Sequence, residues 1–263
     1  MDRIRVLVIG AAGRMGREVV RAVAGQNDMT LVAAVDRAGV GRDAGSLAGL
    51  EPSGLAVTGS LLEAIARTSP EVSVDFSLPD AVMANARTTV AANVATVIGA
   101  TGLTDQNLTE LASLCVEQQT PAFYTPNFAI GAVLMMQFAT QAARHMEAAE
   151  IIELHHATKL DSPSATAVRT AQLMAAAPGA RATRPPSADH GPARGQTVSS
   201  IPVHSVRLPG LVAHQEVIFG AVGQTLSIRH DSTGRESFMP GVLLAMRKIR
   251  SLAGLTVGLE KIL

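Results

Sequence analysis

The chain has 263 residues, 47% of them hydrophobic, which is enough for one large domain or two ordinary ones. Lys and Arg number 22, as do Asp and Glu, so the zero net charge disfavours nucleic-acid or anionic-membrane binding and leaves anion recognition to local sites. The single cysteine, Cys115, excludes an internal disulfide and a multi-cysteine metal site, and the N-terminal MDRIRVLVIG is unlike a secretory signal, so we expect a cytoplasmic protein.

The first half of the chain alternates short β-branched runs with alanine-rich segments. Strands are expected at residues 4–9, 31–35, 72–76, 96–98 and 122–124, and helices at 13–24, 81–93 and 105–117. Asp80 and Thr104 stand where helix N-caps are needed. Continuous apolar runs such as VLVI indicate strands covered on both faces, as in a parallel sheet. The pattern predicts an α/β domain with a Rossmann-type parallel sheet.

After residue 126 the pattern changes. We expect a helix at 131–145, a strand at 151–155, a helix from about 164 to 174, and a mobile surface loop at 178–196. Strand-like runs at 201–206, 213–219 and 225–230 suggest an antiparallel sheet, and a helix at 237–252 closes the chain. Residues 127–236 are therefore expected to form an α+β domain with a mixed or antiparallel sheet. Residues 1–126, with 237–263 packing back, would form the dinucleotide-binding domain.

A glycine motif, GAAGRMG, follows the first expected strand and opens the first helix. Gly10, Gly13 and Gly16 would let the backbone turn tightly and approach a pyrophosphate at the helix N-terminus. An ordinary glycine-rich turn is the simpler alternative. It is less favoured because the strand, the spacing, the helix and a following acid all agree with a dinucleotide site.

That acid is Asp36, at the end of the second expected strand. Its carboxylate could accept hydrogen bonds from an adenosine ribose and would repel a 2′-phosphate. The neighbouring Arg37 could pair with that phosphate, or it could be a solvated surface arginine. The two residues together permit NADH or NADPH, with NADH weakly favoured.

The segment EIIELHHATKLDSPSATAV, residues 150–168, concentrates side chains that can carry chemistry. His155 and Lys159 would share one face of either a strand or a helix, and His156 would point elsewhere. A histidine can exchange a proton near neutrality, and an ammonium can stabilise negative charge. Taken alone, these residues could also be structural histidines and a surface lysine. A metal site is not expected, because the adjacent histidines diverge and no HExxH pattern accompanies them.

A second feature of this segment is the start of a helix after a proline. Ser164 and Thr166 offer hydroxyls beside unpaired first-turn amides, and this combination suits a carboxylate. The substrate is therefore expected to be a small anion.

Six sequence blocks occur together in one order: GAAGRMG at 10–16, VDFSLP at 74–79, GATG at 99–102, PNFAIG at 126–131, HHATKLDSPSAT at 155–166 and HSVRLPGLVAHQEVIF at 204–219. In order and approximate spacing the chain resembles the 4-hydroxy-tetrahydrodipicolinate reductase family of bacterial lysine biosynthesis. The resemblance covers nearly the whole chain. It implies NAD(P)H-dependent reduction of a cyclic imine dicarboxylate to tetrahydrodipicolinate, after loss of the 4-hydroxyl as water, by a homotetramer joined through its C-terminal sheet.

The resemblance also implies roles for single residues. The dinucleotide site would comprise Gly10, Ala11, Ala12, Gly13, Arg14, Met15, Asp36 and Arg37. The loops near the nicotinamide would comprise Gly99, Ala100, Thr101, Pro126, Asn127, Phe128 and Ala129. The catalytic pair would be His155 and Lys159, and the substrate carboxylates would be held by His156, Ala165 and Thr166.

The main departure from the family pattern is Ala165, which stands where the family's PSGT has glycine; Thr158 and Ala100 are lesser departures. If that glycine used a positive φ, alanine would be strained, whereas in a helical first turn it would be harmless. Two other functions remain as alternatives: another NAD(P)-dependent amino-acid-pathway dehydrogenase, and a non-catalytic dinucleotide-sensing protein.

Overall fold

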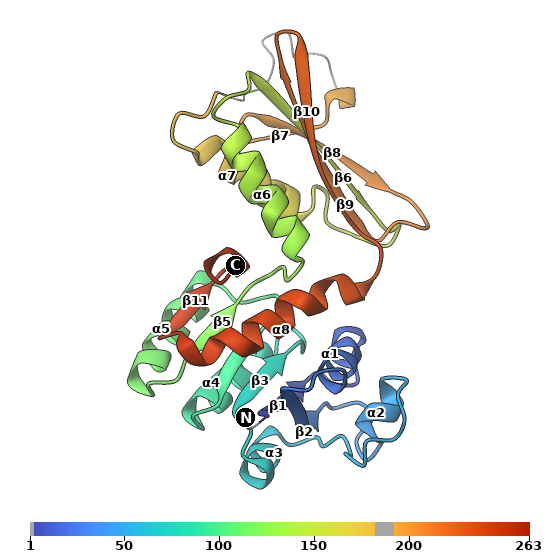
Figure 1. Ribbon diagram of the computed structural model, residues 1–263, viewed down its shortest axis with the longest axis vertical. Coiled ribbons are helices and arrows are strands. Elements are labelled where there is room, and N and C mark those ends of the chain that lie inside the picture. The colour runs from blue at the N-terminus through green and yellow to red at the C-terminus, as the bar shows by residue number, and fades with distance from the viewer. Residues whose placement is uncertain (1–2, 182–191) are drawn as a thin grey trace. The chain divides into compact units, whose positions relative to one another are not determined.

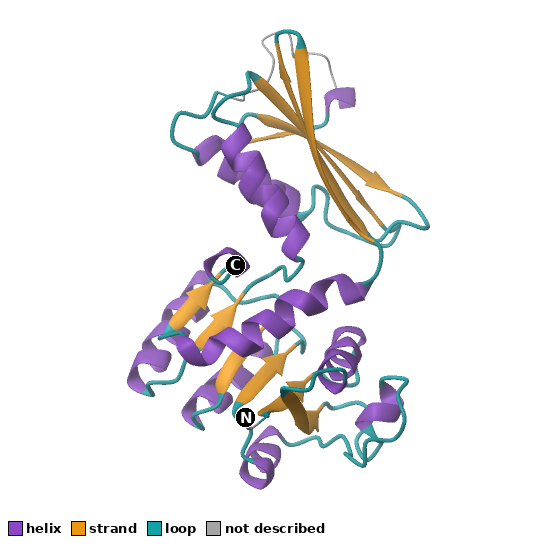
Figure 2. Cartoon of the chain, in the orientation of Figure 1, coloured by secondary structure: helices purple, strands orange, loops and turns teal. Residues whose placement is uncertain are grey.

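The computed structural model describes residues 3–181 and 192–263. The chain divides into two compact units, Met1–Phe128 with Phe238–Leu263, and Ala129–Ser237. Figure 1 labels their helices and strands, and Figure 2 shows them by type. No helix in the described parts of the chain is long and apolar enough to cross a membrane.

The first unit is built on a parallel sheet of order β11-β5-β4-β3-β1-β2. The strands are β1 Ile4–Ile9, β2 Met29–Val35, β3 Val72–Asp75, β4 Ala95–Ile98, β5 Ala122–Tyr124 and β11 Leu255–Val257. Every residue of β3 and β4 is buried, so these central strands are covered on both faces. The Rossmann-type parallel sheet expected from the sequence is confirmed. The sixth strand, β11, was not anticipated from the sequence.

The helices of this unit are α1 Arg14–Ala24, α2 Ala44–Leu47, α3 Leu61–Thr68, α4 Val82–Ala91, α5 Asp105–Glu117 and α8 Met239–Lys248. Thr104 caps α5 in a reciprocal capping box with Asn107, as its position predicted. The prediction for Asp80 was wrong: Ala81 holds the N-cap position of α4, and no side chain bonds the first-turn amides. The expected helix at 237–252 is a shorter α8 flanked by 3-10 turns, Arg235–Phe238 and Ile249–Ser251.

The second unit is a five-stranded sheet of order β10-β9-β6-β8-β7, with α6 Ile130–Ala142 and α7 Ala165–Ala176 packed on one face. The strands are β6 Ala148–His155, β7 Gln196–Val198, β8 Ile201–Arg207, β9 Ala213–Ala221 and β10 Gln224–Ser232. The sheet is mixed, since β6 lies between β9, which is antiparallel to it, and β8, which is parallel. The three C-terminal strands therefore do not form one antiparallel run, because β6 separates β8 from β9.

The expected loop at 178–196 falls mainly outside the described residues, which resume at residue 192. From there the chain forms a short 3-10 helix, Pro192–Arg194, and enters β7. This edge strand was not anticipated from the sequence.

Candidate active site

The glycine loop between β1 and α1 is closely packed against its own backbone and against the end of β3. Gly10 has φ +77°, and a Cβ there would lie 2.8 Å from the carbonyl carbon and oxygen of Phe76. A Cβ on Gly16 would lie 2.0 Å from the carbonyl oxygen of Gly10. Gly13 is the N-cap of α1 and provides no side-chain cap. The loop thus needs glycine at these positions and leaves a helix N-terminus without a side-chain acceptor, which suits a phosphate.

The remaining residues of the motif lie in the same turn and at the start of α1. Ala11 is buried and its N–H donates to the carbonyl of Val35 at 3.2 Å, while Ala12 is half-buried beside it. Arg14 and Met15 are the first two residues of α1. All six loop residues assigned to a dinucleotide therefore lie in the turn or in the first turn of the helix.

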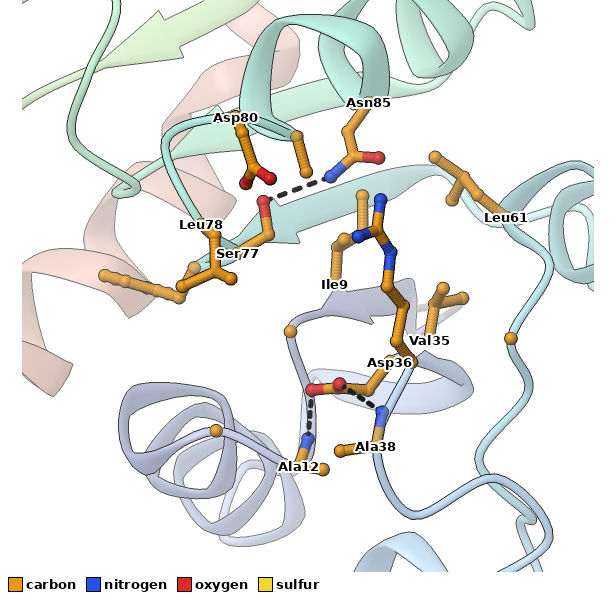
Figure 3. Close-up of a pocket in the computed structure, with 16 residues that line it drawn as sticks. Ile9, Ala12, Val35, Asp36, Ala38, Leu61, Ser77, Leu78, Asp80 and Asn85 are labelled. Carbon is orange, nitrogen blue, oxygen red and sulfur yellow. Dashed lines mark hydrogen bonds between the residues drawn. The ribbon is translucent and has the colours of Figure 1, made fainter.

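The Asp36 carboxylate is fixed directly beside this loop. It follows β2 and accepts the N–H of Ala12 at 2.9 Å and the N–H of Ala38 at 2.8 Å, as Figure 3 shows. The side chain of Arg37 is exposed next to it. Asp36 therefore keeps an ordered acceptor at the position where a ribose hydroxyl is expected to bind.

A cavity of about 440 Å³ opens between the glycine loop, the end of β2 and the end of β3 (Figure 3). Gly10, Ala12, Gly13, Asp36 and Arg37 line it. Its apolar walls and few polar groups are typical of a small-molecule site. The glycine cradle, the free helix N-terminus and the Asp36 carboxylate together fit a dinucleotide.

A polar network at the carboxyl end of β3 was not anticipated. The buried carboxylate of Asp75 accepts the N–H of Ser77 at 2.7 Å and the Nδ2–H of Asn85 at 3.0 Å. Asn85 also donates to the Ser77 hydroxyl oxygen at 3.1 Å, and Ser77 and Asn85 both line the cavity. Burial raises the pKa of Asp75, although the hydrogen bonds oppose this. The sequence signal was available in VDFSLP, where polar residues follow a buried strand.

The loops assigned to the nicotinamide leave the carboxyl ends of β4 and β5. The N–H groups of Gly99 and Ala100 donate to the Asp75 carbonyl at 2.9 and 3.0 Å, and Thr101 follows on the surface. A Cβ on Gly99 would lie 2.3 Å from the Phe76 ring. That ring lies 5.8 Å from the ring of Phe128, centroid to centroid.

In the second of these loops, the hydroxyl of Thr125 stabilises a turn. Thr125 donates to the Asn127 carbonyl at 3.0 Å and accepts the Asn127 N–H at 3.3 Å. Pro126 is exposed, whereas Phe128 and Ala129 are buried at the start of α6. Gly99 and Phe128 thus lie close to Phe76, and Ala100 bonds to Asp75, at the carboxyl end of β3.

In the second unit, His155 ends β6 and Lys159 lies in the turn that follows. The Nδ1 atom of His155 is 2.5 Å from Oε2 of Glu153, and the Nζ atom of Lys159 is 2.7 Å from Oδ1 of Asp161. Each residue thus has its own carboxylate partner. The strand does not continue to Lys159, so strand alternation does not place the two side chains on one face. His156 is exposed in the same turn, with its Nδ1 atom 2.9 Å from the Thr158 hydroxyl.

A buried ion pair lies behind His155. Arg207 donates from Nη1 to Oε2 of Glu153 at 2.8 Å and from Nη2 to Oε1 at 2.7 Å. Burial alone would raise the pKa of Glu153, but hydrogen bonds from His155, Arg207 and Ser205 lower it to about 2. Sequence analysis missed this pair. Its signal was Glu153 itself, a charged residue at a core position of an alternating strand.

The N-terminus of α7 is formed by three of the predicted substrate residues. Ser164 is the N-cap and accepts the N–H of Ala167 at 3.2 Å, while Ala165 and Thr166 form the first turn. Ala165 is helical and does not have a positive φ, so its methyl group causes no backbone strain. Of the two alternatives stated for this position, the helical first turn is the one observed. Hydrogen bonding to Lys159 lowers the pKa of the nearby Asp161.

The sequence matches two profiles of one protein family, described as dihydrodipicolinate reductase, N-terminus, over residues 4–128, and C-terminus, over residues 131–263. A relative named 4-hydroxy-tetrahydrodipicolinate reductase from Moorella thermoacetica is 52% identical over 261 residues, 99% of this chain and 98% of the relative. A protein of the same name from Synechocystis sp. is 44% identical over 273 residues, 100% of this chain and 98% of the relative.

Two solved structures are similar to the chain. A dipicolinate-bound dihydrodipicolinate reductase from Paenisporosarcina sp. has a TM-score of 0.86 and 41% identity, covering 99% of this chain and 100% of that one. An amine dehydrogenase from Mycobacterium smegmatis has a TM-score of 0.70 at 14% identity, covering 96% and 94%. At that identity the second likeness concerns the fold alone.

Proposed function

The chain belongs to the dihydrodipicolinate reductase family, and we propose that it catalyses NAD(P)H-dependent reduction of 4-hydroxy-tetrahydrodipicolinate, via the dihydrodipicolinate imine, to tetrahydrodipicolinate. This reaction belongs to diaminopimelate and lysine biosynthesis. The observation that carries the proposal is that one chain combines the glycine cradle beside Asp36 with a His155, Lys159 and α7 cluster. Full-length relatives at 44–52% identity carry the name of this activity.

We assign cofactor binding to the first unit. The loop of Gly10 to Gly13 and the N-terminus of α1 would hold the pyrophosphate, and Asp36 would accept the adenosine ribose hydroxyls. Gly99 to Thr101 and Pro126 to Ala129 would border the nicotinamide, whose reduced ring supplies a hydride. The chain's own contribution here is to bind and orient.

Substrate binding is assigned to the second unit. The substrate's carboxylates carry negative charge, and the first turn of α7 has the amides of Ala165 and Thr166 with the Thr166 hydroxyl. The Ala165 amide also interacts with the Asp161 carboxylate, which a substrate carboxylate would replace. Lys159 adds an ammonium, and His156 is exposed in the adjoining turn. This arrangement favours a small dicarboxylate over a neutral substrate.

Reduction of an imine leaves a nitrogen that must gain a proton. His155 is suited to that step because its Nδ1 atom is engaged by Glu153, which leaves Nε2 as the atom that can exchange a proton. The ammonium of Lys159 would stabilise developing charge or deliver the proton itself. We therefore assign His155 and Lys159 as the catalytic pair.

We further propose a homotetramer joined through the sheet of the second unit, acting in the cytoplasm. Strand β10 is the edge strand next to β9, and six of its nine residues are exposed. Leu226 on this strand is 42% exposed and Val222, in the adjoining turn, is 87% exposed. An open edge with exposed apolar side chains is the kind of surface that another copy covers.

The proposed activity is tested with purified protein, NADH or NADPH and freshly generated substrate, by following the loss of reduced-nicotinamide absorbance. Substrate-dependent oxidation that is lost in the double variant His155→Ala, Lys159→Ala would support the proposal. Binding of NADH without substrate-dependent oxidation would instead support the dinucleotide-sensing alternative. Oxidation with another amino-acid precursor and none with this substrate would support a different dehydrogenase.

A further inference from the structure

The helix-covered face of β6 changes from apolar to charged as the strand approaches its end. Ile151, Glu153 and His155, which are every second residue of the strand, lie on this face. Ile151 belongs to the core beneath α6 and α7. Glu153 takes the next core position and its side chain is 0% exposed. Carboxylates are rarely buried so completely unless a charged partner is present.

The partner is Arg207, at the end of β8. Its guanidinium meets both carboxylate oxygens of Glu153 in a two-pronged geometry, and its side chain is 18% exposed. The same guanidinium donates from Nη2 to the carbonyl of Asp161 at 2.6 Å. Arg207 therefore connects the buried carboxylate to the turn that carries Lys159.

Each oxygen of Glu153 has a further donor. Oε2 lies 2.5 Å from Nδ1 of His155, and Oε1 accepts the N–H of Ser164, the N-cap of α7, at 3.2 Å. An ionised carboxylate can only accept hydrogen bonds, so the Nδ1 atom of His155 must carry the proton in that contact. In neutral His155 the lone pair is then on Nε2.

Stability alone is a weak reason to keep such a pair. Well-packed hydrophobic residues in place of a buried ion pair are often neutral or stabilising, because taking two charges out of water is costly. The groups that the pair contacts, His155, Ser164 and Asp161, belong to the three segments that carry the proposed catalytic and substrate residues. The location of the pair therefore indicates that it orients the residues of the proposed site.

We propose that Glu153, braced by Arg207, is a positioning residue that fixes the Nδ1–H tautomer and ring orientation of His155 and anchors the first turn of α7. This inference rests on the proposed function. It extends that function by giving one buried side chain control over both the proton-transfer group and the carboxylate site.

The same strand offers a matched control. Glu150 lies on the opposite face of β6 and also contacts an arginine and a histidine, with Arg194 at Oε1 and His204 Nε2 2.7 Å from Oε2. Its side chain is 26% exposed and contacts none of the proposed site residues. Glu150→Gln removes the same charge from a similar triad at the other face.

Steady-state kinetics compare Glu153→Gln, Glu150→Gln and the wild type. Outer partners of metal-bound histidines commonly contribute about 10- to 100-fold, and we expect a kcat loss of that size in Glu153→Gln. KM should rise less, because the amide oxygen of glutamine can still accept the N–H of Ser164 when its NH2 group faces His155. NADH affinity should not change, and Glu150→Gln should behave as the wild type. Equal kcat in both variants and the wild type would overturn the proposal.

Two further measurements distinguish the proposed positioning role from a purely structural role. Nitrogen-15 NMR should show neutral His155 protonated on Nδ1 in the wild type and shifted toward the Nε2–H form in Glu153→Gln. In a His155→Ala background, Glu153→Gln should lower kcat much less than it does alone, because its effect passes through the ring. An Nε2–H tautomer in the wild type, or an undiminished kcat loss in that background, would contradict the proposal.

Two precautions keep the test decisive. If Glu153→Gln does not fold, Arg207→Lys retains the charge and loses the two-pronged contact; it should lower kcat by less, and His155 should keep its Nδ1–H tautomer because Glu153 is still a carboxylate. A wild-type kcat in Arg207→Lys would then count against the bracing role. Failure of the proposed function is distinguishable, because the wild type would then show no substrate-dependent turnover while the NMR tautomer could still be read.

Discussion

The carboxylate of Asp36 accepts the backbone N–H of Ala12 at 2.9 Å, so the acid at the end of β2 also holds the glycine loop in place. Removing the side chain would therefore disturb both the ribose acceptor and the loop. Variants that keep or remove the acceptor oxygen separate these two effects.

Replacing Asp36 by asparagine should shift cofactor preference toward NADPH. Asparagine keeps an oxygen acceptor for Ala12 but removes the charge that repels a 2′-phosphate. Hydrogen bonds to charged groups contribute about 1.5–3 kcal/mol, so the kcat/KM ratio of NADPH to NADH should rise by about 10- to 100-fold. Asp36→Ala should show the same shift with weaker binding of both cofactors. An unchanged ratio in both variants would remove Asp36 from the ribose site.

Ala165→Gly should change KM for the substrate little. Ala165 is the first residue of α7 and has no positive φ, so a substrate carboxylate needs its N–H and not the absence of a methyl group. Glycine should cost about 1 kcal/mol or less of helix stability. KM comes from steady-state kinetics, and stability from thermal unfolding. A large fall in KM would show that the methyl group obstructs the pocket.

Stability should fall in acid in a way that depends on Glu153. The pKa of this carboxyl is depressed from 4.5 to about 2, so its stabilisation is present above pH 4.5 and is lost as the pH falls through the folded value. The shift corresponds to about 3 kcal/mol of unfolding free energy. Urea unfolding at several pH values should show that loss.

Glu153→Gln provides the comparison for that experiment. The pKa of Asp43, on the surface, is also lowered to about 2, so part of the acid sensitivity belongs to other groups. The difference between the wild type and Glu153→Gln isolates the buried carboxyl and should shrink between about pH 4.5 and pH 2. A difference that is constant over this range would contradict the assigned pKa.

Local sequence patterns were enough to predict much of the fold and the position of the glycine loop between β1 and α1. Three features depend only on neighbouring residues, and the residue spacing predicted each of them. They are the bounds of β1, the start of α1 after Gly13 and the N-cap at Thr104. The pairing of Glu153 with Arg207 was not, because the two are 54 positions apart and meet only when β6 lies beside β8. That arrangement is decided by the whole sheet. The likeness to a known family assigned His155 and Lys159, while their separate carboxylate partners required the structure.

The central claim is that the second unit performs proton transfer on a substrate while the first holds the cofactor, and Lys159→Ala tests it most directly. General acid catalysis commonly raises the reaction rate by about 10²- to 10⁴-fold, so kcat should fall by a factor in that range. NADH affinity, measured by fluorescence titration of the same variant, should stay as in the wild type. Near-normal turnover in Lys159→Ala, or loss of NADH binding with the fold intact, would contradict the account.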